Sequence, residues 1–193
     1  LILKTIEVLK SLNKLNEVDK DSILNITNHS YFNLNGGVDT VFDQELKVYT
    51  DKVALNVGPM ASDEVINVKG TAFDFTALSK MNDVLSIGHS NLSKGGLDHN
   101  YVFEDMSFKK MAELSSDKLS LMVESDLPGM HIYTGNYLGH LEGKDNHTYE
   151  DYYGICFECQ YYPNGINYDN YIKPYIYKNI EVNHKIVYTL EGK

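Results

Sequence analysis

Short apolar stretches separated by turn-forming residues run along most of the chain. In Lys185–Glu191, Ile186, Tyr188 and Leu190 occupy alternate positions and therefore share one face of an extended strand. Stretches of this kind are typical of strands of about five or six residues, so the pattern predicts an all-β fold. Further strands are predicted at Gln44–Tyr49, Glu64–Val68, Asp98–Phe103, Ser120–Ser125, Met130–Tyr133 and Tyr153–Gln160.

Two segments follow this pattern less clearly. In Leu1–Leu15, apolar residues including Ile2, Ile6 and Leu9 fit one face of a helix, but the same segment also fits a pair of strands. A short helix is predicted around Phe75–Leu78. No change in composition marks a linker, so residues 1–193 are expected to form one domain.

The composition is that of a folded, acidic protein. Of the 193 residues, 42% are hydrophobic, which is enough for a substantial core, and the formal net charge is −10. All 17 basic residues are Lys, so no Arg is available for a bidentate contact with phosphate. These features argue against nucleic acid as a partner and against a hexose phosphate as a substrate.

The sequence also predicts a compartment. No apolar run reaches the roughly 20 residues of a membrane span, and Leu1–Leu15 contains several charged residues, unlike a signal peptide. Cys156 and Cys159 are too few for a disulfide-stabilised secreted domain. A cytoplasmic protein without a membrane partner is expected, and no oligomeric state is predicted.

Small polar side chains surround His29 in the segment Asn25–Leu34. A histidine titrates near neutral pH, so it can donate a proton to a substrate oxygen and take it back. The alternative is a structural histidine bonded to a backbone carbonyl, and composition alone favours that interpretation.

Two carboxylates stand at strand positions from which they could reach a ligand. Asp98 follows a glycine-rich turn and could accept hydrogen bonds from ligand hydroxyls, or it could only satisfy the amides of the turn. In the strand near the C-terminus, Ile155 and Phe157 share an apolar face, whereas Glu158 lies on the opposite face. A Glu inside an apolar stretch is costly unless it is paired or functional, although a solvent-facing side of the sheet would also hold it.

Two histidines stand in the predicted strands Met130–Tyr133 and Asp98–Phe103. His131 and Tyr133 share a strand face and could line a cleft, or they could form the wet side of a half-buried strand. His99 alternates away from Asp98, so these two neighbours need not act together.

The Cys156–Cys159 pair spells C-x-x-C, but the context fits neither a redox site nor a metal site. A turn at Pro163–Gly165 follows the pair, where a redox motif needs a helix. A strand places residues three apart on opposite faces, so the two thiols cannot converge on a metal. Two buried side chains that behave as small apolar residues are expected.

Taken in order, five segments resemble motifs of the aldose 1-epimerase (galactose mutarotase) family. The longest is the run NITNHSYFNL, which is similar to the family's N-x-T-N-H-S-Y-F-N-L signature. The other four resemble its G-T-x-F-D-F, G-x-D-H-N-x-V, Y-T-G-N and G-x-x-x-E-x-Q-x-x-P segments. The five segments are Asn25–Leu34, Val68–Phe75, Gly96–Phe103, Tyr133–Asn136 and Gly154–Pro163.

The resemblance implies a fold, a reaction and a set of roles. The fold would be the galactose mutarotase-like β-sandwich (supersandwich), and the reaction the interconversion of α and β anomers of free hexoses without metal or organic cofactor. By position in the motifs, His29 would be the general acid, Glu158 the general base, and Asp98 a substrate-binding carboxylate. His29 and Glu158 are expected to face each other across a pocket, with room for a pyranose ring between them.

The chain also departs from the family pattern. His131, a further substrate-binding candidate, stands where members commonly carry Gln, and Tyr161–Asn164 stands where His-Phe-Pro-Asp is common. The chain is expected to be a C-terminal portion of a longer β-sandwich, without the N-terminal strands and without the Arg and His that contact the sugar. The alternative function is a non-catalytic or truncated carbohydrate-binding module of the same fold.

Overall fold

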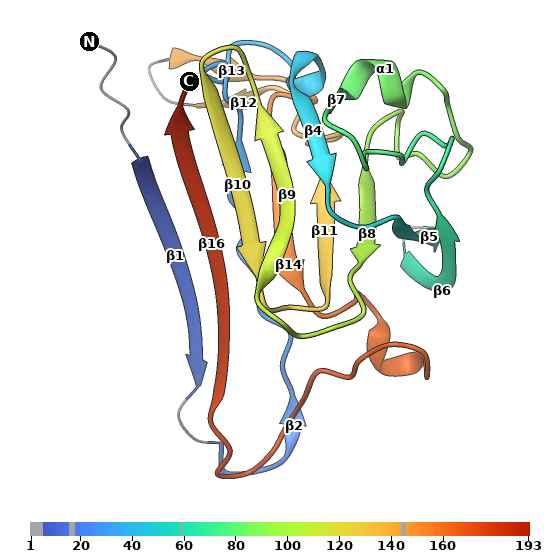
Figure 1. The fold of residues 1–193 in the computed structure, drawn as a ribbon, viewed down its shortest axis with the longest axis vertical. Coiled ribbons are helices and arrows are strands. Elements are labelled where there is room, and N and C mark those ends of the chain that lie inside the picture. Colours follow the sequence, from blue (N-terminus) through green and yellow to red (C-terminus); the bar gives the residue numbers. More distant parts are fainter. Residues whose placement is uncertain (1–5, 16–17, 59, 144–145) are drawn as a thin grey trace.

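Two six-stranded antiparallel sheets dominate the computed structural model, which describes the backbone of residues 6–15 and all of residues 18–58, 60–143 and 146–193 (Figure 1). The first sheet has the order β1–β16–β10–β9–β4–β7, with bounds Ile6–Leu15, Val182–Gly192, Leu119–Ser125, Lys109–Ser115, Glu45–Val48 and Ser79–Lys80. The second has the order β3–β14–β11–β8–β5–β6, with bounds Tyr31–Phe32, Ile155–Gln160, Gly129–Tyr133, Asp98–Val102, Lys52–Val57 and Met60–Asn67.

Short elements connect the long strands. Two small antiparallel pairs are β12–β13 and β15–β2, with bounds Leu141–Glu142, Thr148–Tyr149, Tyr175–Ile176 and Ser22–Ile23. Helical elements in the described ranges include α1 (Met81–Leu85), η1 (Val41–Asp43) and η3 (Gly165–Asn167). Across the described ranges, no helix is long and apolar enough to cross a membrane.

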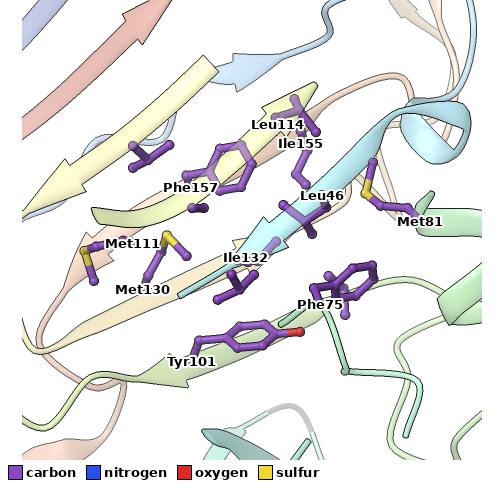
Figure 2. Packing of buried hydrophobic residues seen from close by; sticks show 14 of the residues in the cluster. Leu46, Phe75, Met81, Tyr101, Met111, Leu114, Met130, Ile132, Ile155 and Phe157 are labelled. Atoms are coloured by element: carbon purple, nitrogen blue, oxygen red, sulfur yellow. The ribbon is translucent and has the colours of Figure 1, made fainter. Parts of the chain in front are cut away.

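The apolar faces of the two sheets meet in one core (Figure 2). Leu46 and Leu114 come from the first sheet, Ile132 and Phe157 come from the second, and all four are fully buried. The Tyr188 hydroxyl on β16 donates a hydrogen bond to the Phe157 carbonyl on β14 at 2.8 Å. This bond satisfies a buried hydroxyl and ties the two sheets together.

The strand predicted at Lys185–Glu191 is confirmed and forms the middle of β16. Ile186 and Tyr188 lie in the core and Leu190 packs against it, as their alternation predicts. β16 pairs with β1 from Ile6 opposite Glu191 to Leu15 opposite Val182. The helix considered for Leu1–Leu15 is therefore wrong, and residues 6–15 form one strand, not the pair of strands that was the other prediction. Residues 1–5 lie outside the described part of the chain.

The helix predicted around Phe75–Leu78 is also wrong. The Asp74 carboxylate accepts hydrogen bonds from the backbone N–H and the hydroxyl of Thr76, which fixes a local turn in place of a helix. The Phe75 carbonyl then accepts from the backbone N–H of Val48 in β4 at 2.7 Å, and the Phe75 ring is buried. A helix forms only afterwards, at α1.

Candidate active site

An open pocket of about 370 Å³ lies on the second sheet, on the face that points away from the core. All four site residues predicted from the sequence line it, namely His29, Asp98, His131 and Glu158. The remaining lining residues are Tyr133, Tyr137, Gln160 and Pro163. The pocket therefore combines two carboxylates, two imidazoles and two phenol rings.

Strand register places the carboxylates beside the central strand of the pocket. β11 lies between β8 and β14, with His131 opposite Glu158 and Tyr133 opposite Asp98. Because side chains alternate along a strand, these four residues project from the same face of the sheet. This row is the floor of the pocket.

His29 reaches this floor from the loop before β3. β3 pairs with β14 so that Tyr31 lies opposite Cys156, and His29, two residues earlier, comes to lie beside Glu158. The distance from His29 Nε2 to Glu158 Oε1 is 3.4 Å, and the distance from His29 Nδ1 to Cys156 Sγ is also 3.4 Å. The rings of Tyr31 and Tyr133 flank the imidazole, with centroids at 5.2 and 6.3 Å.

The contact between His29 and Glu158 differs from the predicted geometry, and the surroundings of the two residues decide between the interpretations left open for each. A pyranose ring does not fit between His29 and Glu158, because the pairing of β3 with β14 brings the two side chains together on one side of the pocket. His29 contacts the Glu158 carboxylate and the Cys156 thiol, which is more than a structural contact with a backbone carbonyl. Glu158 is only 9% exposed, so the interpretation as an ordinary solvent-facing Glu is wrong.

Burial raises the pKa of Glu158 above its ordinary value, because desolvation disfavours the charged carboxylate. His131 and His29 act in the opposite direction and lower this pKa, since a positive imidazolium stabilises the carboxylate. Glu158 is therefore a carboxylate made more basic by its surroundings, with two imidazoles at hand.

Asp98 pairs with His131 at the other side of the pocket. His131 Nε2–H donates to Asp98 Oδ1 at 2.8 Å, so the carboxylate of Asp98 does more than cap its own turn. His99 points away from Asp98, as its alternation predicts, and is fully buried with Nε2 3.0 Å from the Asn91 carbonyl. Burial lowers the pKa of His99 to about 4.

Both cysteines are unpaired and buried, and they lie on opposite faces of β14 as predicted. Cys159 packs in the core, whereas Cys156 lies under His29. Within the described side chains, no group of three or more His, Cys, Asp or Glu could hold a metal ion.

Sequence reasoning missed one contact beside the pocket and two residues that line it. The contact of Cys156 with His29 was missed, although Cys156 stands two residues before Glu158 on the same strand face. Tyr137 and Pro163 line the pocket from loops that follow β11 and β14, and no strand pattern marks them.

Comparisons with known proteins agree on one family. The sequence model described as aldose 1-epimerase matches residues 9–189. The galactose mutarotase of Sus scrofa is 32% identical over 167 residues, which cover 83% of this chain and 48% of that protein. The aldose 1-epimerase of Escherichia coli K12 is 28% identical over 162 residues, which cover 81% of this chain and 47% of that protein.

Solved structures give the same picture of the fold. A GalM/aldose epimerase homologue from C. elegans superposes with a TM-score of 0.79 at 21% identity, covering 98% of this chain and 56% of that one. A galactose 1-epimerase from Lactobacillus acidophilus superposes with a TM-score of 0.77 at 27% identity, covering 96% and 53%. The chain thus has a mutarotase-like β-sandwich fold and spans about half the length of the curated relatives it matches.

Proposed function

The chain belongs to the aldose 1-epimerase family, and on this premise we propose that it interconverts the α and β anomers of free hexoses such as galactose and glucose. One observation carries the proposal: an imidazole and a buried carboxylate, His29 and Glu158, meet at 3.4 Å in a pocket that also holds Asp98 and His131. We further propose a cytoplasmic location, which the two unpaired buried cysteines suit.

The closeness of His29 and Glu158 fits the chemistry of the anomeric carbon. The ring oxygen and the anomeric hydroxyl of a pyranose are both bonded to C1, so an acid and a base that act on them need neighbouring positions. His29 donates a proton to the ring oxygen while Glu158 takes the proton of the anomeric hydroxyl. The C1–ring oxygen bond breaks, and an open-chain aldehyde forms.

Reclosure completes the exchange of anomers. Rotation about the C1–C2 bond presents the other face of the aldehyde to the hydroxyl that re-forms the ring. His29 then takes back the proton of that hydroxyl, and Glu158 returns a proton to the aldehyde oxygen. Both residues regain their starting protonation, so no metal, reductant or organic cofactor takes part.

The surroundings of the pair suit these roles. Burial makes the carboxylate of Glu158 a stronger base than an exposed Glu, and the nearby imidazole of His131 limits this rise in pKa. The Asp98–His131 pair offers hydrogen-bonding groups to sugar hydroxyls. Tyr133 and Tyr137 offer ring faces to the apolar face of the sugar.

The test is the polarimetric decay of freshly dissolved α-D-galactose and α-D-glucose with and without the protein. His29→Ala and Glu158→Gln are each expected to lower the accelerated rate by about 100-fold or more, because each removes an acid or base from the reaction. Glu158→Gln should leave stability nearly unchanged.

An exposed histidine–glutamate pair outside the pocket supplies matched control variants. His140 and Glu150 contact each other at 2.8 Å outside the pocket, so His140→Ala and Glu150→Gln should keep the wild-type rate. A folded protein that binds hexose in calorimetry without accelerating mutarotation would contradict the proposal. It would favour the non-catalytic carbohydrate-binding module.

A further inference from the structure

Two side chains bond the backbone of Asp98 where the pairing of β5 with β8 ends. The paired residues of these strands end at Ala54 and Asn100. Beyond that point the Asn56 side chain takes the place of a strand, and its Nδ2 donates to the Asp98 carbonyl at 2.8 Å. The backbone N–H of Asp98 donates to Nδ1 of the next residue, His99, at 3.0 Å.

A third side chain joins these two into a closed network. Asn91, in the loop before β8, pairs its amide with the backbone of Asn56. Its Oδ1 accepts from the Asn56 N–H and its Nδ2 donates to the Asn56 carbonyl, both at 2.8 Å. The carbonyl oxygen and Oδ1 of Asn91 each lie 3.0 Å from His99 Nε2. The hydrogen bonds therefore run from the N–H of Asp98 through His99, Asn91 and Asn56 back to the Asp98 carbonyl.

These contacts determine the tautomer of His99. A backbone N–H can only donate, so Nδ1 must accept and carries no proton. The neutral ring then carries its proton on Nε2, which faces two oxygen acceptors of Asn91. The ring is fully buried, which favours its neutral form, and it packs against Phe73 with the ring centroids 4.7 Å apart.

We propose that His99 is a positioning residue that, with Asn91 and Asn56, fixes the carboxylate of Asp98 at the pocket. The side chains of Asp98 and His99 point to opposite faces of β8, so the imidazole acts on Asp98 through the backbone. A fixed backbone limits where the carboxylate can lie and preorganises its contact with His131 at 2.8 Å. The effect on the sugar rests on the proposed function, whereas the effect on Asp98 does not.

Two substitutions of His99 separate positioning from packing. Asn places an oxygen near the position of Nδ1, so His99→Asn can still accept from the N–H of Asp98. Gln places its amide near the position of Nε2, so His99→Gln can still donate to Asn91 but leaves the Asp98 N–H without its acceptor. Both variants remove the ring that packs against Phe73, so a role limited to packing would be lost equally in both.

NMR measures the hydrogen bond and the position of Asp98 without any sugar. The wild type should show an unprotonated His99 Nδ1 with a scalar coupling to the backbone ¹⁵N of Asp98. The ring ¹⁵N shifts of His131, which contacts the Asp98 carboxylate, should change in His99→Gln and stay near the wild-type values in His99→Asn. A wild-type His99 protonated on Nδ1 would overturn the proposal even if neither variant folds. Equal His131 shifts in the two folded variants would overturn it as well.

The mutarotation assay tests the consequence for the sugar. His99→Gln should raise KM for galactose about 5- to 10-fold, as expected for one lost hydrogen bond. Its kcat should stay within about twofold, because His29 and Glu158 lie outside the network. His99→Asn should recover most of the loss. Equal KM values in the two variants would overturn the role of His99 in sugar binding.

Asn56→Ala tests the other end of the network. It removes the donor to the Asp98 carbonyl and should raise KM by a similar factor. Asn67→Ala is the matched control, since the exposed Asn67 side chain on β6 donates to Asp51 and should leave KM at the wild-type value. An unchanged KM in Asn56→Ala would overturn the role of the network. An inactive wild type whose His131 shifts still distinguish the two His99 variants would count against the proposed function alone.

Discussion

Glu158 is subject to two opposing influences in the pocket. Burial raises its pKa, whereas the imidazoles of His131 and His29 lower it. The protonation state of a base in such a position depends on each neighbour, so small changes beside it alter the pH range in which it works.

The change His131→Gln tests this balance. Gln keeps hydrogen-bonding groups but cannot carry a positive charge, so the pKa of Glu158 should rise further. Since Glu158 must be ionised to act as the base, the acid limb of the kcat/KM profile for mutarotation should move to higher pH. Activity near pH 5.5 should fall more than activity near pH 8.

His140→Gln is the control for this experiment, because His140 is 85% exposed and lies outside the pocket. Its profile should match that of the wild type. An acid limb that stays in place or moves to lower pH in His131→Gln would show that His131 does not tune Glu158.

Four residues that line the pocket could be predicted as site residues, but the contacts among the pocket's side chains could not. His29, Asp98 and Glu158 occur in segments that resemble family motifs, and strand alternation assigned Glu158 to the face opposite the core. The contacts of His29 with Glu158 and Cys156 depend on the pairing of β3 with β14, two strands more than a hundred residues apart. Alternation within one strand carries no information on such pairing.

At the scale of elements, the turn before β8 sets the position of Asp98. Thr134 Oγ, just after β11, accepts from the backbone N–H of Leu97 at 2.9 Å, and Asn136 Nδ2 donates to the Leu97 carbonyl at 3.0 Å. Gly96 packs directly against these two side chains. Two of the motif segments noted in the sequence are thus parts of one buried hydrogen-bonded contact.

Gly96→Ala should break this contact. An added Cβ would lie 2.3 Å from Asn136 Oδ1 and 2.4 Å from Thr134 Oγ, so the network must shift. The free energy of unfolding in urea should fall by about 1–3 kcal/mol, and hexose binding should weaken because Asp98 moves with the turn. Gly192→Ala, whose added Cβ meets nothing within 4 Å, should change stability by less than about 0.5 kcal/mol.

Alternation predicted the strands that have one apolar face and failed where the pattern is mixed. β5 and β9 were not predicted: in β5 the buried Val53 and Ala54 are adjacent, and in β9 the buried Met111 and Ala112 are adjacent. The wrong helix around Phe75–Leu78 has a different cause, since a side-chain hydrogen bond there outweighs an apolar spacing. Pairing with neighbouring strands decided β5 and β9, whereas a local contact decided this turn.

At the scale of the whole molecule, His99 couples folding to pH. It is fully buried and its pKa is lowered to about 4, whereas an unfolded chain has a histidine pKa near 6.5. Below about pH 6.5 the unfolded state therefore binds a proton that the folded state does not. The stabilisation by neutral His99 is full above this pH and is lost as the pH falls toward 4.

The free energy of unfolding should thus drop by about 2 kcal/mol between pH 7 and pH 5 through His99. The raised pKa of Glu158 acts with the opposite sign, because protonation of a buried carboxyl relieves its burial. Urea unfolding of Glu158→Gln at both pH values removes this opposing contribution. A stability that is equal or higher at pH 5 in this variant would contradict the prediction.

The pairing of β1 with β16 also orders events in time. β1 is made before every other described strand, and its neighbour in the sheet, β16, is made after all of them. β16 also separates β1 from β10, so the first sheet cannot close while the ribosome is still translating the last described residues. Until β16 has left the ribosome, β1 lacks its final neighbour, so completion of the first sheet is among the last steps in folding of the described strands.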